Sequence, residues 1–257
     1  MKLDKQTQSD LFDYLLRLGD DRLILGHRVS EWCGHGPILE EDIALSNIAL
    51  DLIGQSINFL SLAGKVEGQG RTEDDLAYHR DALDFKNLML VEQPNGDFGF
   101  TMVRQFLFDA YSLLLMEALQ ASELKELAAI AGKALKEVRY HLRHSSQWVL
   151  RLGDGTEESH RRVQNALDDL WMYTREMFES DEVEQRLVQK GIAVDSTSLK
   201  SGWESMVFQI LKQATLEIPG EQGYYSSGSR QGIHTEHLGY ILADMQFLPR
   251  AYPDAKW

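Results

Sequence analysis

The chain has little of what disulfide-bonded, nucleic-acid-binding or membrane-spanning proteins need. Cys33 is its only cysteine in 257 residues, so neither an intrachain disulfide nor a four-cysteine metal site can form. Lysine and arginine are not clustered and the formal net charge is −14, which excludes the phosphate backbone as a natural ligand. The most apolar stretch, residues 113–116, is too short to cross a bilayer, and residues 1–10 lack the apolar core of a signal peptide. These absences indicate a soluble cytoplasmic protein that binds neither nucleic acid nor membrane.

Proline and strand-like patterns are also scarce. Only five prolines occur, and no segment combines strict alternation with β-branched residues. Without strands, there is no place for a phosphate-binding glycine loop or a G-x-S-x-G nucleophile elbow, so Ser226, Ser227 and Ser229 do not indicate a nucleophile. Leucine, alanine, glutamate and glutamine dominate the periodic stretches instead. The composition predicts an all-α protein whose dispersed acidic residues form a solvated surface or, alternatively, face a basic partner.

Apolar residues at helical spacing predict four long helices followed by three more. The long ones run from about Ser9, as N-cap, to Trp32, from near Leu39 to Gly64, from Asp97 to Ala121, and from Ser122 to about residue 152. The later ones cover about 157–180, 196–216 and 235–247, the last ended by Pro249. A capping box of Thr72 and Asp75 predicts a short helix over about 73–85, and residues 219–232 read as an extended loop. With no long linker, the prediction is one domain over residues 1–257.

Four acidic residues lie inside the long predicted helices, in two pairs separated by 30 and 28 residues. They are Asp21, Asp51, Asp109 and Glu137. A di-iron four-helix bundle takes one carboxylate from each of two helices and a Glu-x-x-His from each of the other two. Here the position three beyond Asp51 is Gly54, and the position three beyond Glu137 is Tyr140. The pattern predicts the carboxylate skeleton of a di-iron bundle without two of its histidines, and therefore no metal held by this chain.

Periodicity places Asp21 and Asp51 on apolar sides of their helices, Asp51 together with Ile43, Leu50 and Ile57. Buried carboxylates need cations, hydrogen-bond donors or metal. Lys133 lies one turn before Glu137 and His141 one turn after it, so both can neutralise carboxylates on that face.

A metal-binding alternative remains open. His141 and His144 form an H-x-x-H pair, and Glu137 with His141 has a spacing of four rather than three. In this alternative the chain is a di-iron enzyme in its own right. Its ligands would be Asp21, Asp51, Asp109, Glu137 and His141.

Two further clusters have simpler explanations. The segment His234–His237 begins a predicted helix, and Thr235 as its N-cap explains the cluster better than an anion site does. The large apolar side chains fit core or interface packing rather than a cofactor pocket. These include Trp32, Trp148, Trp171, Trp203 and Met206.

Eight stretches of the sequence resemble one family, the C subunits of bacterial phenylacetyl-CoA oxygenases, also called ring 1,2-epoxidases. They are LGDD (18–21), SEWC (30–33), EEDIAL (40–45), IALDLIGQ (48–55), VEQPNGD (91–97), KEVRYH (136–141), LGDGTEESH (152–160) and HTEHLG (234–239). The resemblance covers nearly the whole chain. It implies a ferritin-like four-helix bundle with additional C-terminal helices.

The resemblance also implies a role in phenylacetate catabolism. In that family the C subunit is regarded as structural and pairs with a homologous catalytic A subunit, which carries the di-iron centre and binds phenylacetyl-CoA. A separate reductase subunit with FAD and an iron–sulfur cluster passes electrons from NADPH, and the complex inserts one oxygen atom of O2 into the ring.

For this chain the resemblance implies no catalytic residue and no cofactor. Its partners would be the A subunit and other oxygenase subunits, with a homodimer as a further form of the isolated chain. The former metal-site positions would be Asp21, Asp51, Asp109 and Glu137, with His141 and Lys133 as compensating groups. Two hypotheses stand beside this structural role: the di-iron enzyme, and a helical interaction module that uses its acidic face.

Overall fold

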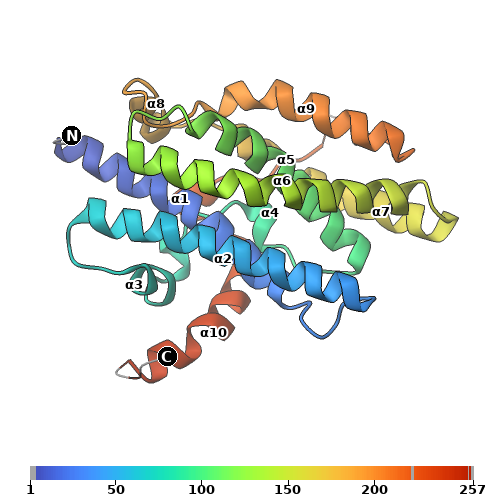
Figure 1. The fold of residues 1–257 in the computed structure, drawn as a ribbon, viewed down its shortest axis with the longest axis horizontal. Coiled ribbons are helices and arrows are strands. Elements are labelled where there is room, and N and C mark those ends of the chain that lie inside the picture. The colour runs from blue at the N-terminus through green and yellow to red at the C-terminus, as the bar shows by residue number, and fades with distance from the viewer. Residues whose placement is uncertain (1–3, 221–222, 254, 256–257) are drawn as a thin grey trace. The chain divides into compact units, whose positions relative to one another are not determined.

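Every regular element in residues 4–220, 223–253 and 255, the part of the chain that the computed structural model describes, is a helix. Within these residues there are ten α-helices and three short 3-10 helices, and no strand, which confirms the all-α class. Contacts divide the chain into two compact units. The first comprises Met1–Pro94 with Gly228–Trp257, and the second comprises Asn95–Ser227. Figure 1 labels the α-helices along the chain.

The first unit is built on an antiparallel hairpin of α1 (Lys5–Ser30) and α2 (Leu39–Glu67). Gln8 near the start of α1 donates to the Val66 carbonyl near the end of α2, at 2.5 Å. The two backbones approach closely at Gly19, where an added Cβ would lie 2.6 Å from the Leu60 side chain. The predicted start of α1 at Ser9 is wrong, because Asp4 caps the helix by accepting a hydrogen bond from the Thr7 N–H.

Shorter elements complete the first unit. They are α3 (Glu73–Tyr78), η1 (Ala82–Asp84), α4 (Met89–Glu92), η3 (Ser229–Gln231) and α10 (Glu236–Ala251). The capping box of Thr72 and Asp75 is confirmed, although the helix that it starts ends at Tyr78. Pro249 does not end α10, which runs on to Ala251, because a proline removes only its own N–H donor and leaves those of the residues after it. Part of the predicted loop, residues 221–222, lies outside the described residues.

The second unit is built on the antiparallel hairpin of α5 (Phe98–Leu119) and α6 (Lys125–Gly153), with Arg139 of α6 ion-paired to Glu117 of α5 at 3.1 Å. It continues through α7 (Glu157–Trp171), η2 (Arg175–Phe178), α8 (Glu182–Val188) and α9 (Ser196–Gln213). The predicted helix over 157–180 is therefore two shorter ones. Trp171 and Trp203 are buried with ring centroids 5.7 Å apart, as core packing predicts.

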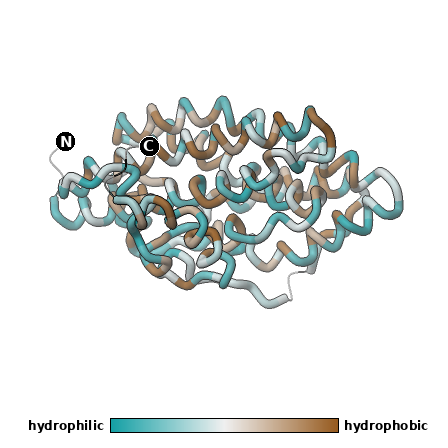
Figure 2. The backbone as a smooth tube through the Cα atoms, turned by 90° about the horizontal axis from the view of Figure 1, so that it is seen from below, coloured by the Kyte–Doolittle hydropathy of each residue, from teal (hydrophilic) through white to brown (hydrophobic). Residues whose placement is uncertain are grey.

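Each unit thus contributes one long helical hairpin, which is consistent with a ferritin-like four-helix bundle. Figure 2 shows hydrophobic and hydrophilic residues alternating along the helices, as amphipathic helices require.

Among the described helices, α2 is long and apolar enough to span a membrane, with 44% of its most apolar window buried. A single such helix is weak evidence for a membrane, because core helices pass the same test.

Candidate functional site

The first functional candidate, Asp21, is fully buried and bound on both carboxylate oxygens. The Arg230 guanidinium donates to Oδ1 and Oδ2, each at 3.0 Å, and the Leu88 N–H donates to Oδ1 at 2.7 Å. Arg230 belongs to η3, which follows Gly228 at φ 110°, a backbone conformation that favours glycine. Such a two-pronged guanidinium contact is among the strongest hydrogen-bonded ion pairs in proteins. The charge of Asp21 is therefore neutralised by the chain itself.

Its neighbour Asp20 is paired in the same way. Arg80 donates to both carboxylate oxygens, through Nη2 to Oδ1 and through Nη1 to Oδ2 at 2.9 Å, and the Lys86 N–H donates to Oδ2 at 2.9 Å. The Arg80 guanidinium also lies 4.3 Å from the centre of the Phe85 ring. Both aspartates of the LGDD stretch are consequently held by arginines from distant parts of the sequence.

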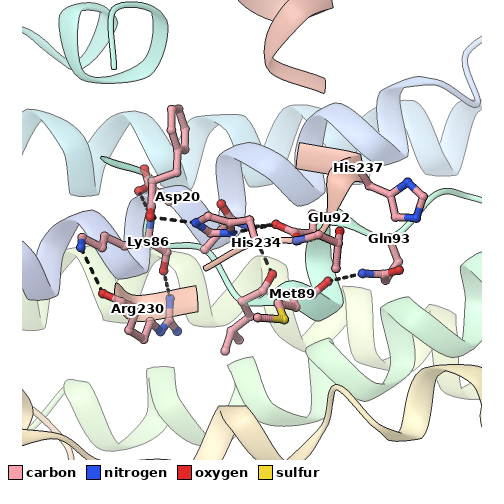
Figure 3. Close-up of polar contacts among 12 residues, drawn as sticks. Asp20, Lys86, Met89, Glu92, Gln93, Arg230, His234 and His237 are labelled. Atoms are coloured by element: carbon pink, nitrogen blue, oxygen red, sulfur yellow. Dashed lines mark hydrogen bonds and ion pairs between the residues drawn. The ribbon is translucent and has the colours of Figure 1, made fainter. Parts of the chain in front are cut away.

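Glu92 is a third buried carboxylate, and Figure 3 shows its contacts with His234. Its oxygens accept from Asn87 Nδ2 at 2.9 Å and from the Thr235 N–H at 2.6 Å, and His234 Nδ1 lies 3.0 Å away. His234 Nε2 faces the Phe85 carbonyl at 3.0 Å, so both ring contacts are hydrogen bonds when both nitrogens carry protons. Thr235 is the N-cap of α10 as predicted, but its side chain makes no capping bond.

These contacts describe a structural latch, which we define as Asp20, Asp21 and Glu92 with their partners Arg80, Arg230 and His234. The latch fastens the C-terminal segment to α1 and α4, because Arg230 and His234 belong to that segment and Asp21 and Glu92 to the two helices. Ions paired this closely have their charges neutralised and their lone pairs already in hydrogen bonds. The latch is therefore better suited to stabilising the fold than to chemistry on a substrate.

In the second unit, Asp109 of α5 and His141 of α6 lie close enough for the charge of His141 to act on Asp109. Asp109 Oδ2 accepts from Ser145 Oγ at 2.7 Å, and both Asp109 and His141 are buried. Burial raises the pKa of Asp109 from 3.8 to about 6, although the His141 charge and the Ser145 hydrogen bond act in the opposite direction. A fraction of Asp109 is therefore protonated near neutral pH.

The remaining predicted positions lie nearer the surface. Glu137 of α6 is half-buried, and Lys133 is exposed. Asp51 is half-buried too, on the side of α2 where Leu50 and Ile57 are exposed, so its apolar side is not the one that packs against α1. The helix has two apolar faces, and periodicity alone does not distinguish the one that packs against α1.

The residues present do not fit a di-iron centre. A metal at Asp21 would have to displace or lie beside the Arg230 guanidinium, whose positive charge opposes a cation. The two histidine positions hold Gly54 and Tyr140, neither of which supplies an imidazole. Across the described parts of the chain, no group of three or more His, Cys, Asp or Glu side chains is arranged to hold a metal ion.

Sequence reasoning missed the partners of the buried carboxylates. Arg230 lies in a glycine- and serine-rich segment with no helical periodicity, so its sequence context does not indicate a buried partner. Only the folded chain brings it to Asp21, which is 209 residues away in the sequence. The burial of Glu92 could have been predicted, because it directly follows the apolar run of residues 88–91. A carboxylate buried there needs hydrogen-bond donors. Of the two predicted compensating groups, His141 acts on Asp109, whereas the cation at Asp21 is Arg230.

Comparison with known proteins gives two matches. The family model described as "Phenylacetic acid catabolic protein" matches residues 1–257. The C subunit of the 1,2-phenylacetyl-CoA epoxidase of Escherichia coli (strain K12), a curated protein, is 50% identical over 249 residues, which are 97% of this chain and 100% of that protein.

Proposed function

Because the chain belongs to the phenylacetic acid catabolic protein family, we propose that it is the structural C subunit of a phenylacetyl-CoA 1,2-epoxidase. In this proposal it is a single ferritin-like domain over residues 1–257, soluble in the cytoplasm, that takes part in phenylacetate catabolism. Half of its residues are identical to those of a named C subunit along the full length of that protein, which supports the same place in a complex.

One observation carries the non-catalytic role: the Asp21 carboxylate, a ligand position of the di-iron pattern, is bound by Arg230 and the Leu88 N–H. A guanidinium at that place supplies the positive charge that a metal would otherwise supply. The reacting di-iron centre then belongs to the catalytic A subunit, and FAD and the iron–sulfur cluster belong to the reductase. The acidic chain supports the A subunit, and its own buried carboxylates are structural.

Reconstitution tests this role. The catalytic A subunit should be purified alone and together with this chain, and its thermal unfolding and phenylacetyl-CoA epoxidation should be measured with reductase and NADPH. We expect the A subunit to unfold at lower temperature and to lose most of its activity without the chain. An A subunit equally stable and active alone would contradict the structural role.

A further inference from the structure

A cavity of about 400 Å³ lies within the second unit, where α9 meets the end of α7 and η2. Its walls are mainly aromatic, with the rings of Trp171, Phe178, Trp203, Phe208 and Tyr225. Pockets that hold small molecules have volumes of about 300–1,000 Å³ and mostly apolar or aromatic walls with a few polar groups. The size and lining of this cavity are therefore those of a site for a small ligand.

The aromatic walls are fixed by their own packing. The centre of the Trp171 ring lies 6.2 Å from that of Phe208, with which it is stacked, and 5.7 Å from that of Trp203. Trp203 lies 5.3 Å from Phe178 in the same measure, and its Nε1 donates to the Leu107 carbonyl at 3.0 Å. Because these rings are already held, another ring that packs against them orders few further side chains. Aromatic pairs also gain from stacked and edge-to-face contacts, so the walls favour an aromatic group over an aliphatic one.

The charged groups in the lining are two cations and one carboxylate, Arg175, Lys200 and Glu204. Lys200 Nζ lies 3.6 Å from Glu204 Oε1, and Arg175 Nε lies 4.0 Å from Oε1 of Glu179. Both distances are longer than a hydrogen bond, and ion pairs between exposed side chains contribute little. The Arg175 guanidinium also lies 5.6 Å from the centre of the Tyr225 ring, which places it beside an aromatic wall. Both cations therefore keep N–H donors for an anion in the cavity.

The excess of cations in the lining contrasts with the net charge of −14 for the whole chain. The chain as a whole repels an anion, so only a local group of cations such as this one favours its binding. A guanidinium can donate two parallel hydrogen bonds to a carboxylate, and an ammonium adds a third donor at the same place.

We propose that this cavity binds a small aromatic carboxylate, with its ring against the tryptophan and phenylalanine rings and its carboxylate at Arg175 and Lys200. This ligand class uses both the aromatic walls and the cations of the lining. The inference goes beyond the structural role proposed above and does not depend on it, because the site is built from residues of the second unit alone.

The test is a titration of the purified full chain with phenylacetate, which has one aromatic ring and one carboxylate. Calorimetry measures the dissociation constant, and the fluorescence of Trp171 and Trp203 reports a ligand in the cavity because both indoles line it. We expect saturable binding at one site per chain. Phenylacetamide, which has the same ring without the charge, and cyclohexylacetate, which has the charge without the aromatic ring, should each bind at least tenfold more weakly.

The double variant Arg175→Gln with Lys200→Gln should raise the dissociation constant for phenylacetate at least tenfold and leave that for phenylacetamide unchanged. Arg161→Gln with Lys212→Gln is the matched control, since both side chains are exposed and neither lines the cavity. We expect the control to bind phenylacetate like the wild type. Both double variants should keep the wild-type thermal midpoint, because the four side chains are largely exposed and make no buried ion pair.

Three results would overturn the proposal. They are the absence of saturable binding at millimolar phenylacetate, equal binding of phenylacetate by the wild type and R175Q/K200Q, and equal binding of phenylacetate and phenylacetamide by the wild type. Tighter binding of adenosine monophosphate than of phenylacetate would also contradict it, since the cavity would then be a nucleotide site. Because the titration uses the isolated chain, none of these results alters the expected outcome of reconstitution with the A subunit.

Discussion

Replacing Arg230 with methionine should lower the free energy of unfolding by about 3–5 kcal/mol, the range for removing one partner of a buried ion pair. The Arg230 side chain is 15% exposed and that of Asp21 only 1%, so the substitution leaves a carboxylate in the interior that still accepts from the Leu88 N–H but has lost its counter-charge. Urea denaturation followed by circular dichroism at pH 7.5 measures the difference.

Arg250→Met is the matched control. Arg250 also ties the C-terminal segment to its unit, through the Tyr78 and Arg80 carbonyls and the exposed Asp81, but it neutralises no buried charge. We expect a loss of about 1 kcal/mol or less for this exposed contact. Adding Asp21→Leu to Arg230→Met should recover much of the lost stability, because the orphaned charge is removed. If R230M cost no more than R250M, the Asp21–Arg230 pair would not be a structural element of the latch.

Asp109→Asn should stabilise the chain by about 1–3 kcal/mol at pH 7.5 and by little at pH 4. The folded-state pKa of Asp109 is raised to about 6 from 3.8, chiefly by burial. The stability that comes from the protonated carboxyl is thus fully present below pH 4 and is lost as the pH rises through 6. Asparagine keeps an acceptor for Ser145 and removes the titration.

The difference in unfolding free energy between D109N and the wild type, measured from pH 4 to pH 8, isolates this group from all others that titrate. Asp169→Asn changes an exposed carboxylate of α7 and serves as control, with a difference near zero throughout. A D109N difference that stayed constant across this range, or that shrank as the pH rose, would contradict the raised pKa of Asp109.

Much of the helical architecture could be predicted from the sequence because each long helix has its own apolar stripe and a recognisable cap or break. Asp97 at the start of the long helix α5 is an example, and Thr72 caps the short helix α3 in the same way. The errors occurred where local pattern is insufficient. Pro249 does not end its helix, and α2 has two apolar faces, of which the sequence does not say which one packs against α1.

The candidate site was only partly predictable. The burial of Asp21 follows from helical spacing, because it shares a helix face with Leu18 and Leu25. The proximity of Asp109 and His141 does not follow from spacing, because the two residues lie on different helices. The neutralising partner of Asp21 does not follow from spacing, since Arg230 reaches it only through tertiary folding of the C-terminal segment. Local periodicity thus finds the buried charge, and only the fold supplies its counter-charge.

Iron content tests most directly whether the buried carboxylates of this chain are neutralised by its own side chains rather than by a metal. The chain should be purified after expression in iron-supplemented medium and its iron measured per polypeptide, with the A subunit from the same culture as reference. We expect iron well below one atom per chain, and a paired centre in the A subunit. Nearly two iron atoms per polypeptide in this chain would contradict it and favour the di-iron enzyme.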